Sequence, residues 1–251
     1  MDQDAILALE SSHTSGVYPK RRLAIVRGAG AHLWDADGNR YIDCVGGQGA
    51  ANLGHAHPAV VSAICAQAGR LISCPEIFYN DQRAHLLEEL VGVAPEGLDR
   101  AFLCNSGTEA VEAAIKFARA VTGRPEIVAA MRGFHGRTMG ALSATWTRSY
   151  REPFEPLVPG FHHVPYNDLA ALEQRMTTSA LATAAVLLEV VQGEGGVHPA
   201  TNAAGNKSAR YESDPMKAVT GIHPPGSSLK SGPEEHFAGQ LFHEALELEA
   251  Q

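Results

Sequence analysis

A short turn of small polar residues constrains this chain more than any other feature. Residues 101–104 are apolar and strand-like, the turn contains Ser106, Gly107 and Thr108, and a helix-forming stretch begins at Glu109. This order leaves the amides of Gly107 and Thr108 unpaired at the helix start, where the helix dipole adds roughly half a positive charge. A phosphate is the natural occupant of such a site. A Ser/Thr helix cap without a ligand has the same sequence, so both interpretations stay open on this motif alone.

The chain that surrounds this turn alternates strand-like and helix-like segments. Apolar runs at residues 127–131 and 184–190 predict strands buried on both faces, and residues 162–164 predict a third strand. Helical periodicity is found at residues 58–68, 82–93, 109–121, 138–144 and 169–177. This succession of βα units predicts an α/β domain with a mostly parallel sheet flanked by helices.

Two regions of different character flank this α/β pattern. Residues 1–19 are polar and predict an N-terminal arm, and the strand and turn signals that follow predict a three-stranded β-meander. Residues 1–55 therefore form one region and residues 56–200 the α/β domain. Residues 201–251 are rich in Gly, Ser, Pro, Asn, Lys and Glu, which predicts an atypical tail of low order. A frameshifted or truncated coding sequence and a natural linker with a docking helix both fit this tail.

Composition excludes several classes of protein. With 45% hydrophobic and 19% charged residues, the 251-residue chain has the composition of a soluble globular protein. Its formal charge of −8 argues against a nucleic-acid surface. The sequence has neither a secretion signal nor an apolar run that spans a membrane, so we expect a cytoplasmic protein. Four cysteines without a CxxC spacing predict reduced, buried thiols and no metal site: Cys44, Cys65, Cys74 and Cys104.

Three further blocks accompany the turn, at residues 34–43 (WDADGNRYID), 133–138 (GFHGRT) and 189–196 (EVVQGEGG). Together with the turn they resemble the class III aminotransferases over residues 16–200. The similarity is greatest to the acetylornithine branch, notably the form that acts on lysine precursors held by an amino-group carrier protein. The resemblance implies the large domain of the fold-type-I transferases that depend on pyridoxal 5′-phosphate (PLP), here incomplete. It also implies a homodimer that transfers an amino group between glutamate or 2-oxoglutarate and the semialdehyde of a blocked arginine or lysine precursor.

The same resemblance assigns five residues to the cofactor's phosphate and ring. It places the phosphate on Ser106, Gly107 and Thr108, as the helix start also suggests. Phe134 follows a predicted strand directly, where a flat aromatic ring can stack on a flat cofactor, and His135 lies next to it. Taken alone, Phe134 and His135 are better explained as packed structural residues of the loop.

Three more residues follow the strand predicted at residues 184–190. The resemblance implies that Glu189 supports the acidic residue that holds the cofactor's ring nitrogen. It implies that Glu194 and Gln192 contact the substrate, with Glu194 paired to an arginine beyond Ala200. The chain departs from the family at Val190, where a proline is usual. As surface carboxylates, Glu189 and Glu194 would need no special explanation.

The Schiff-base lysine of the family is not found. Lys207, Lys217 and Lys230 are the only lysines after Ala200, and none of them follows an apolar strand. We therefore assign no catalytic residue and expect no catalysis by this chain alone. The alternative function is a non-catalytic module that binds PLP or phosphate, or that assembles with another subunit.

Overall fold

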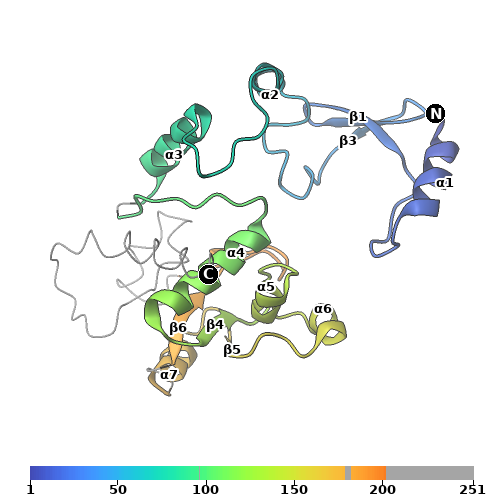
Figure 1. The fold of residues 1–251 in the computed structure, drawn as a ribbon. Helices are drawn as coiled ribbons and strands as arrows, with labels where there is room; N and C mark the ends of the chain where they lie inside the picture. Colours follow the sequence, from blue (N-terminus) through green and yellow to red (C-terminus); the bar gives the residue numbers. More distant parts are fainter. Residues whose placement is uncertain (96, 179–181, 202–251) are drawn as a thin grey trace. The chain divides into compact units, whose positions relative to one another are not determined.

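A computed structural model describes residues 1–95, 97–178 and 182–201, and its chain divides into two compact units (Figure 1). The first unit is Met1–Asn80 and the second is Asp81–Gln251. Helix α2 (Pro58–Ala68) falls in the first unit, although the sequence analysis assigned it to the α/β domain. The division at residue 55 stays a prediction. In the described ranges, no helix has the length and apolar character needed to cross a membrane.

The first unit contains the expected meander. Strands β1 (Ile25–Ala29), β2 (His32–Asp35) and β3 (Arg40–Ile42) are antiparallel in the order β1-β2-β3. The buried carboxylate of Asp35 fixes the turn between β2 and β3, because it accepts hydrogen bonds from the Asn39 amide and from the Tyr41 hydroxyl, both at 2.8 Å. The prediction of a three-stranded meander is confirmed.

The N-terminal arm carries more regular structure than its polar composition suggested. Helix α1 (Gln3–His13) occupies most of residues 1–19. The Asp2 side chain caps the helix by accepting a hydrogen bond from the Ala5 amide at 2.8 Å, and Asp4 adds a favourable charge in the first turn. The helix buries none of its residues, so local capping rather than packing accounts for it.

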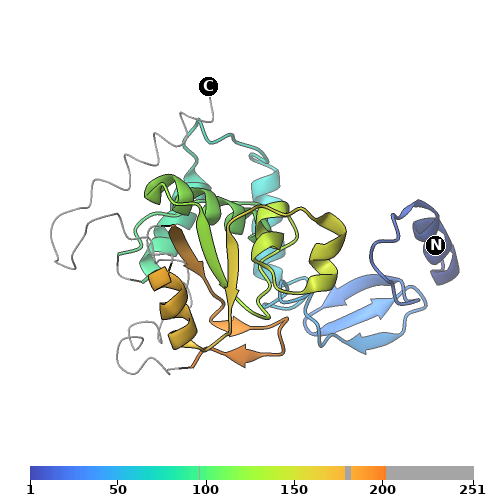
Figure 2. The ribbon, with the colours of Figure 1, turned by 90° about the horizontal axis from the view of Figure 1, so that it is seen from below.

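A parallel sheet forms the centre of the second unit (Figure 2). Strands β4 (Glu126–Ala130), β5 (Phe161–Val164) and β6 (Thr183–Leu187) lie in the order β5-β4-β6, and both neighbours of β4 run parallel to it. β4 is almost wholly buried, as its continuous apolar sequence requires. The predicted α/β fold with a parallel sheet is confirmed, although β6 ends earlier than residue 190.

The helices predicted for this unit are also confirmed. They are α3 (Asp81–Val93), α4 (Gly107–Thr122), α5 (Met139–Ala144) and α7 (Leu169–Thr178). The sequence analysis did not foresee four short elements: α6 (Arg148–Arg151), the 3-10 helix η1 (Glu152–Phe154) and the hairpin of β7 (Val191–Gln192) and β8 (His198–Pro199).

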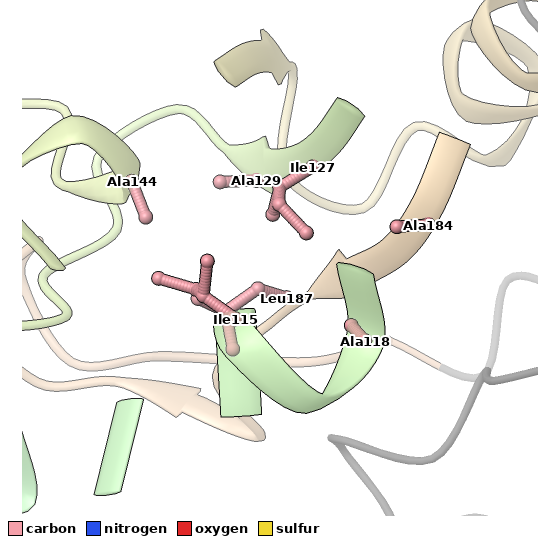
Figure 3. Packing of buried hydrophobic residues seen from close by; sticks show 7 residues of the cluster. All are labelled: Ile115, Ala118, Ile127, Ala129, Ala144, Ala184 and Leu187. Atoms are coloured by element: carbon pink, nitrogen blue, oxygen red, sulfur yellow. The ribbon is translucent and has the colours of Figure 1, made fainter. Parts of the chain in front are cut away.

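The core of the second unit lies between helix α4 and the sheet (Figure 3). Ile115 and Ala118 of α4 face the strands, and most of the residues that they meet are alanines. Small side chains let the helix approach the sheet closely, so that the start of α4 is held at a fixed place beside the strand ends. The cluster consists of Ile115, Ala118, Ile127, Ala129, Ala144, Ala184 and Leu187.

Two predictions are wrong. Residues 101–104 are not a strand, because the structure places no other strand beside them in the described part of the chain; Phe102 is 51% exposed and its ring contacts Phe117 of α4. The cysteines are free but not buried: Cys44 and Cys65 are exposed, and the other two are half-buried. Apolar neighbours in the sequence therefore did not bury these thiols in the fold.

The predicted low-order tail and its three lysines lie outside the described residues, except for Thr201.

Candidate cofactor-binding site

The turn at residues 105–108 forms the start of helix α4. Ser106 is extended (φ −152°, ψ 160°) and its hydroxyl oxygen accepts a hydrogen bond from the Glu109 amide at 3.3 Å. The Glu109 carboxylate reaches back to accept one from the Asn105 amide at 2.8 Å, a variant of the capping box in which the residue before the cap is bound. In the described part of the chain, the amides of Gly107 and Thr108 have no hydrogen-bond partner. The turn is thus a capped helix start that retains two free donors.

Thr108 joins this helix start to the loop that follows β4. Its hydroxyl is 2.8 Å from the hydroxyl of Thr138. Gly136 is buried with φ +133°, and a Cβ added to it would lie 2.3 Å from the Thr108 hydroxyl oxygen. Glycine is required there because the loop passes so close to the helix. The turn at residues 105–108 and the loop that carries Phe134 are therefore in direct contact.

Glu112, one turn further along α4, holds the same loop from its other end. One carboxylate oxygen accepts hydrogen bonds from the Thr138 hydroxyl at 2.5 Å and from the amides of Gly140 and Ala141 at 2.8 and 3.1 Å. Thr138 precedes α5 but does not cap it with its own side chain. Glu112 therefore caps α5 from a neighbouring helix. The sequence analysis missed this role, since a cap from a distant residue leaves no local pattern.

Phe134 lies in this loop and is fastened to the residues that follow β6. Its amide donates a hydrogen bond to Glu189 Oε2 at 3.1 Å. Its ring meets the ring of Tyr150 edge to face, with centroids 6.2 Å apart. Glu189 is half-buried; desolvation raises the pKa of its carboxyl group, and the Phe134 amide partly opposes this. The structure thus brings together two of the predicted site residues, Phe134 and Glu189.

His135 is buried beside the same carboxylate. Its amide donates to the Thr145 hydroxyl oxygen at 2.9 Å, while its Nε2 is buried without a partner in the described ranges. A Cβ added to Gly133 would lie 3.0 Å from this Nε2 and 3.3 Å from Glu189 Oε2, so the two groups border one glycine. Burial, followed by the nearby His163, lowers the pKa of His135 to about 4. The imidazole is therefore neutral at pH 7.

Gln192 and Glu194 occupy different environments. Gln192 is 1% exposed, and its Nε2 donates to the carbonyl oxygen of Met131 at 2.9 Å, which ties the β7 strand to the end of β4. Glu194 is exposed and accepts a hydrogen bond from the Tyr150 hydroxyl at 2.9 Å. Their roles towards a substrate stay predictions. Tyr150 itself was not foreseen, because nothing in its sequence neighbourhood marks it.

A cavity of about 380 Å³ opens near the carboxyl ends of β4 and β5. Of the predicted site residues, Gln192 lines this cavity, whereas Ser106, Gly107, Thr108 and Phe134 do not. Tyr166 borders this cavity, and its hydroxyl donates hydrogen bonds to the carbonyl oxygens of Glu189 and Val190. The cavity is lined by Met131, Arg132, Pro165, Tyr166, Asn167, Gln192 and His198.

Free amides at a helix start, an aromatic ring and a half-buried carboxylate thus gather where parallel strands end. This arrangement is typical of α/β proteins that bind a phosphate-bearing cofactor. The helix start has room for the phosphate of PLP, because the Gly107 amide has no partner in the described part of the chain and a Cβ added to Gly107 would meet nothing within 4 Å.

Comparison with known proteins defines the family. The family model described as Aminotransferase class-III matches residues 15–210. The chain is 54% identical over 197 residues to a LysW-aminoadipate semialdehyde transaminase of Deinococcus radiodurans, covering 78% of this chain and 45% of the relative. It is 50% identical to an acetylornithine aminotransferase of Methanopyrus kandleri, covering 77% of this chain and 49% of the relative. The chain belongs to the class III aminotransferases, and it spans about half the length of these curated relatives.

Solved structures agree with this assignment. An ornithine aminotransferase of Toxoplasma gondii superposes with a TM-score of 0.74 at 31% identity, covering 79% of this chain and 48% of the other. A taurine:2-oxoglutarate aminotransferase of Bifidobacterium kashiwanohense, described in complex with PLP and glutamate, gives a TM-score of 0.75 at 28% identity, covering 81% and 52%. The resemblance and the fold class inferred from the sequence are confirmed.

Proposed function

We propose that this chain forms the phosphate- and ring-binding part of a PLP-dependent aminotransferase. The observation that carries the proposal is the pair of unpartnered amides of Gly107 and Thr108 at the start of α4. The helix dipole favours an anion at this place. Thr108 also contacts the loop that presents Phe134, so one ligand can engage the helix start and the aromatic ring together.

The chain's own residues hold and orient the cofactor. PLP, when bound, supplies the electron sink that amino-group transfer requires. Glu189 Oε2 accepts the Phe134 amide and thereby fixes the loop from which the ring projects. His135 places a neutral, buried imidazole beside Gly133, which Glu189 also borders, so it adds no positive charge next to that carboxylate. Ser106 contributes the cap that keeps the first turn of α4 in place.

The substrates and partners follow from the named relatives. The relatives are transaminases of a LysW-linked aminoadipate semialdehyde and of acetylornithine. We propose the semialdehyde of a blocked arginine or lysine precursor as acceptor, glutamate as donor, and contact with the substrate at Glu194 and Gln192. An amino-group carrier protein and a second copy of the chain are the proposed partners. Free thiols throughout are in keeping with a cytoplasmic location.

Replacement of Gly107 by proline tests the phosphate site directly. Proline lacks the amide hydrogen but suits the first position of a helix, and the extended Ser106 before it has the backbone that a following proline requires. Gly107→Pro should therefore keep the fold and lose one phosphate donor. Gly107→Ala keeps the donor and is the matched control, since its Cβ meets open space.

Pyridoxamine 5′-phosphate is the appropriate probe, because it has no aldehyde to react with surface lysines. We expect Gly107→Pro to weaken its binding about 10- to 100-fold, the effect of losing a hydrogen bond to a charged group. Gly107→Ala should bind within about twofold of the wild type, and pyridoxamine without phosphate should not distinguish the three proteins. Equal binding of the phosphate probe by all three would refute the proposed phosphate site.

A further inference from the structure

We propose that Tyr150 is a positioning residue of the cofactor site, with its hydroxyl holding the Glu194 carboxylate and its ring bracing Phe134. The inference rests on the proposed function and assigns a role to a residue that neither the sequence motifs nor the family resemblance marked. Tyr150 lies in α6, a helix of four residues between α5 and η1.

Two contacts define the position of Tyr150. Its hydroxyl donates a hydrogen bond to Glu194 Oε1 at 2.9 Å, across 44 residues of sequence. Its ring meets Phe134 at an interplanar angle of 82° and a centroid distance of 6.2 Å, the edge-to-face geometry that aromatic pairs favour. The Tyr150 side chain thus contacts both Phe134, the candidate for stacking on the cofactor ring, and Glu194, the candidate for contact with the substrate.

These contacts join two loops that leave the same edge of the sheet. Phe134 follows β4 and Glu194 follows β6, and these strands are parallel neighbours. The Phe134 amide is already bound to Glu189, which also follows β6. Phe134 is therefore held at two points: its main chain binds Glu189, and its ring contacts Tyr150, which binds Glu194.

The electrostatics keep Tyr150 a donor. Its hydrogen bond to Glu194, followed by the charge of that carboxylate, raises the pKa of the phenol, and Arg137 opposes this shift. A neutral donor leaves the Glu194 charge intact. Within the described residues, only one of the two Glu194 oxygens has a hydrogen-bond partner, so the other stays available to a substrate group or to a cation.

Tyrosine titration tests the Glu194 contact without any ligand. The phenol carbons of the six tyrosines can be followed by NMR in the full chain, and loss of one signal in Tyr150→Phe identifies Tyr150. We expect Glu194→Gln to lower the pH at which Tyr150 ionises, because the hydrogen bond to Glu194 is the main cause of the raised pKa of the phenol. Ionisation of Tyr150 at the same pH in the wild type and in Glu194→Gln would overturn the contact.

Binding of pyridoxamine 5′-phosphate tests the brace on Phe134. Tyr150→Phe retains the ring and should bind within about twofold of the wild type, whereas Tyr150→Leu should bind about 2- to 10-fold more weakly, the range for one aromatic pair. Tyr79→Phe, at a fully exposed tyrosine, is the matched control for loss of a tyrosine hydroxyl. A thermal melt shows whether Tyr150→Leu is folded.

The two proposals fail in different ways. If the wild type does not bind the probe, the proposed function fails, and the titration alone decides the role of Tyr150. If the wild type binds it and Tyr150→Leu binds equally well, the brace on Phe134 is refuted while the phosphate site stands. Rescue by phenylalanine but not by leucine, together with the shifted titration, is the result that supports the inference.

Discussion

Truncation of Glu112 to alanine should destabilise the second unit, because this carboxylate caps a helix that cannot cap itself. Thr138 precedes α5 without a side-chain cap, and Glu112 receives the amides of Gly140 and Ala141. Both residues are buried, so water reaches their amides only through the space that the missing carboxylate leaves. The free energy of unfolding should fall in the alanine variant and less so in Glu112→Gln.

The magnitude follows from the donors that lose their acceptor. Each buried amide left without a partner costs about 1–3 kcal/mol, and water entering the vacated space recovers part of this. We expect a loss of about 2–4 kcal/mol for Glu112→Ala. Glutamine still offers an oxygen but no charge at the start of α5, so Glu112→Gln should cost about 1 kcal/mol.

Urea unfolding of the full chain, followed by circular dichroism, measures both losses. Glu152→Ala is the matched control, since Glu152 is exposed and its carboxylate pairs, among the described residues, with Arg148 alone at i,i+4, a contact worth less than about 0.5 kcal/mol. A Glu112→Ala loss as small as that of the control would refute the capping role. Equal losses in Glu112→Ala and Glu112→Gln would show that charge alone is responsible.

Three further predictions concern the loop and two titrating groups. Gly136→Ala should lower the free energy of unfolding by more than about 2 kcal/mol, because its Cβ would lie 2.3 Å from the Thr108 hydroxyl oxygen. The control Gly193→Ala, whose Cβ would meet nothing within 4 Å, should lower it by less than about 1 kcal/mol. Equal losses of the two variants in urea unfolding would contradict this. His135 stays neutral in the folded state down to about pH 4 but is protonated below 6.5 when unfolded, so it should lower the stability by about 2 kcal/mol from pH 7 to pH 5. His135→Gln should reduce the measured slope by that amount and leave the smaller part due to His163, whose pKa burial also lowers; an unchanged slope would contradict this. The His55 hydrogen bond, followed by two backbone amides, lowers the pKa of Asp43 from 3.8 to about 2, so the Asp43 carboxylate stabilises the fold above pH 4 and this effect is lost towards pH 2. The melting temperatures of the wild type and Asp43→Asn should therefore converge as the pH falls over that range. A constant difference between them would argue against this.

Local sequence patterns were sufficient for most of the architecture. Apolar runs located β4 and β6 because a strand that packs on both faces is apolar along most of its length. The turn before α4 was recognisable because cap chemistry lies within four residues of sequence. The family resemblance then pointed to Phe134 and Glu189, which the structure places in contact.

The sequence analysis failed where the outcome depends on distant partners. Residues 101–104 have the composition of a strand, but a strand also needs a neighbour, and composition cannot supply one. The cap on α5 by Glu112 and the contact of Tyr150 with Glu194 link residues 28 and 44 positions apart. Such pairs become visible only when the sheet has brought the loops after β4 and β6 to the same edge.

The central claim, that a cofactor phosphate lies on the start of α4, is tested most directly by amide NMR. Pyridoxamine 5′-phosphate would be titrated into the ¹⁵N-labelled full chain, with pyridoxamine as the control without phosphate. We predict saturable downfield shifts of the Gly107 and Thr108 amides, together with shifts at Phe134, with the phosphate ligand only. Saturable binding that leaves both amides unmoved, or that shifts residues around the cavity of Arg132 and His198 instead, would contradict the account.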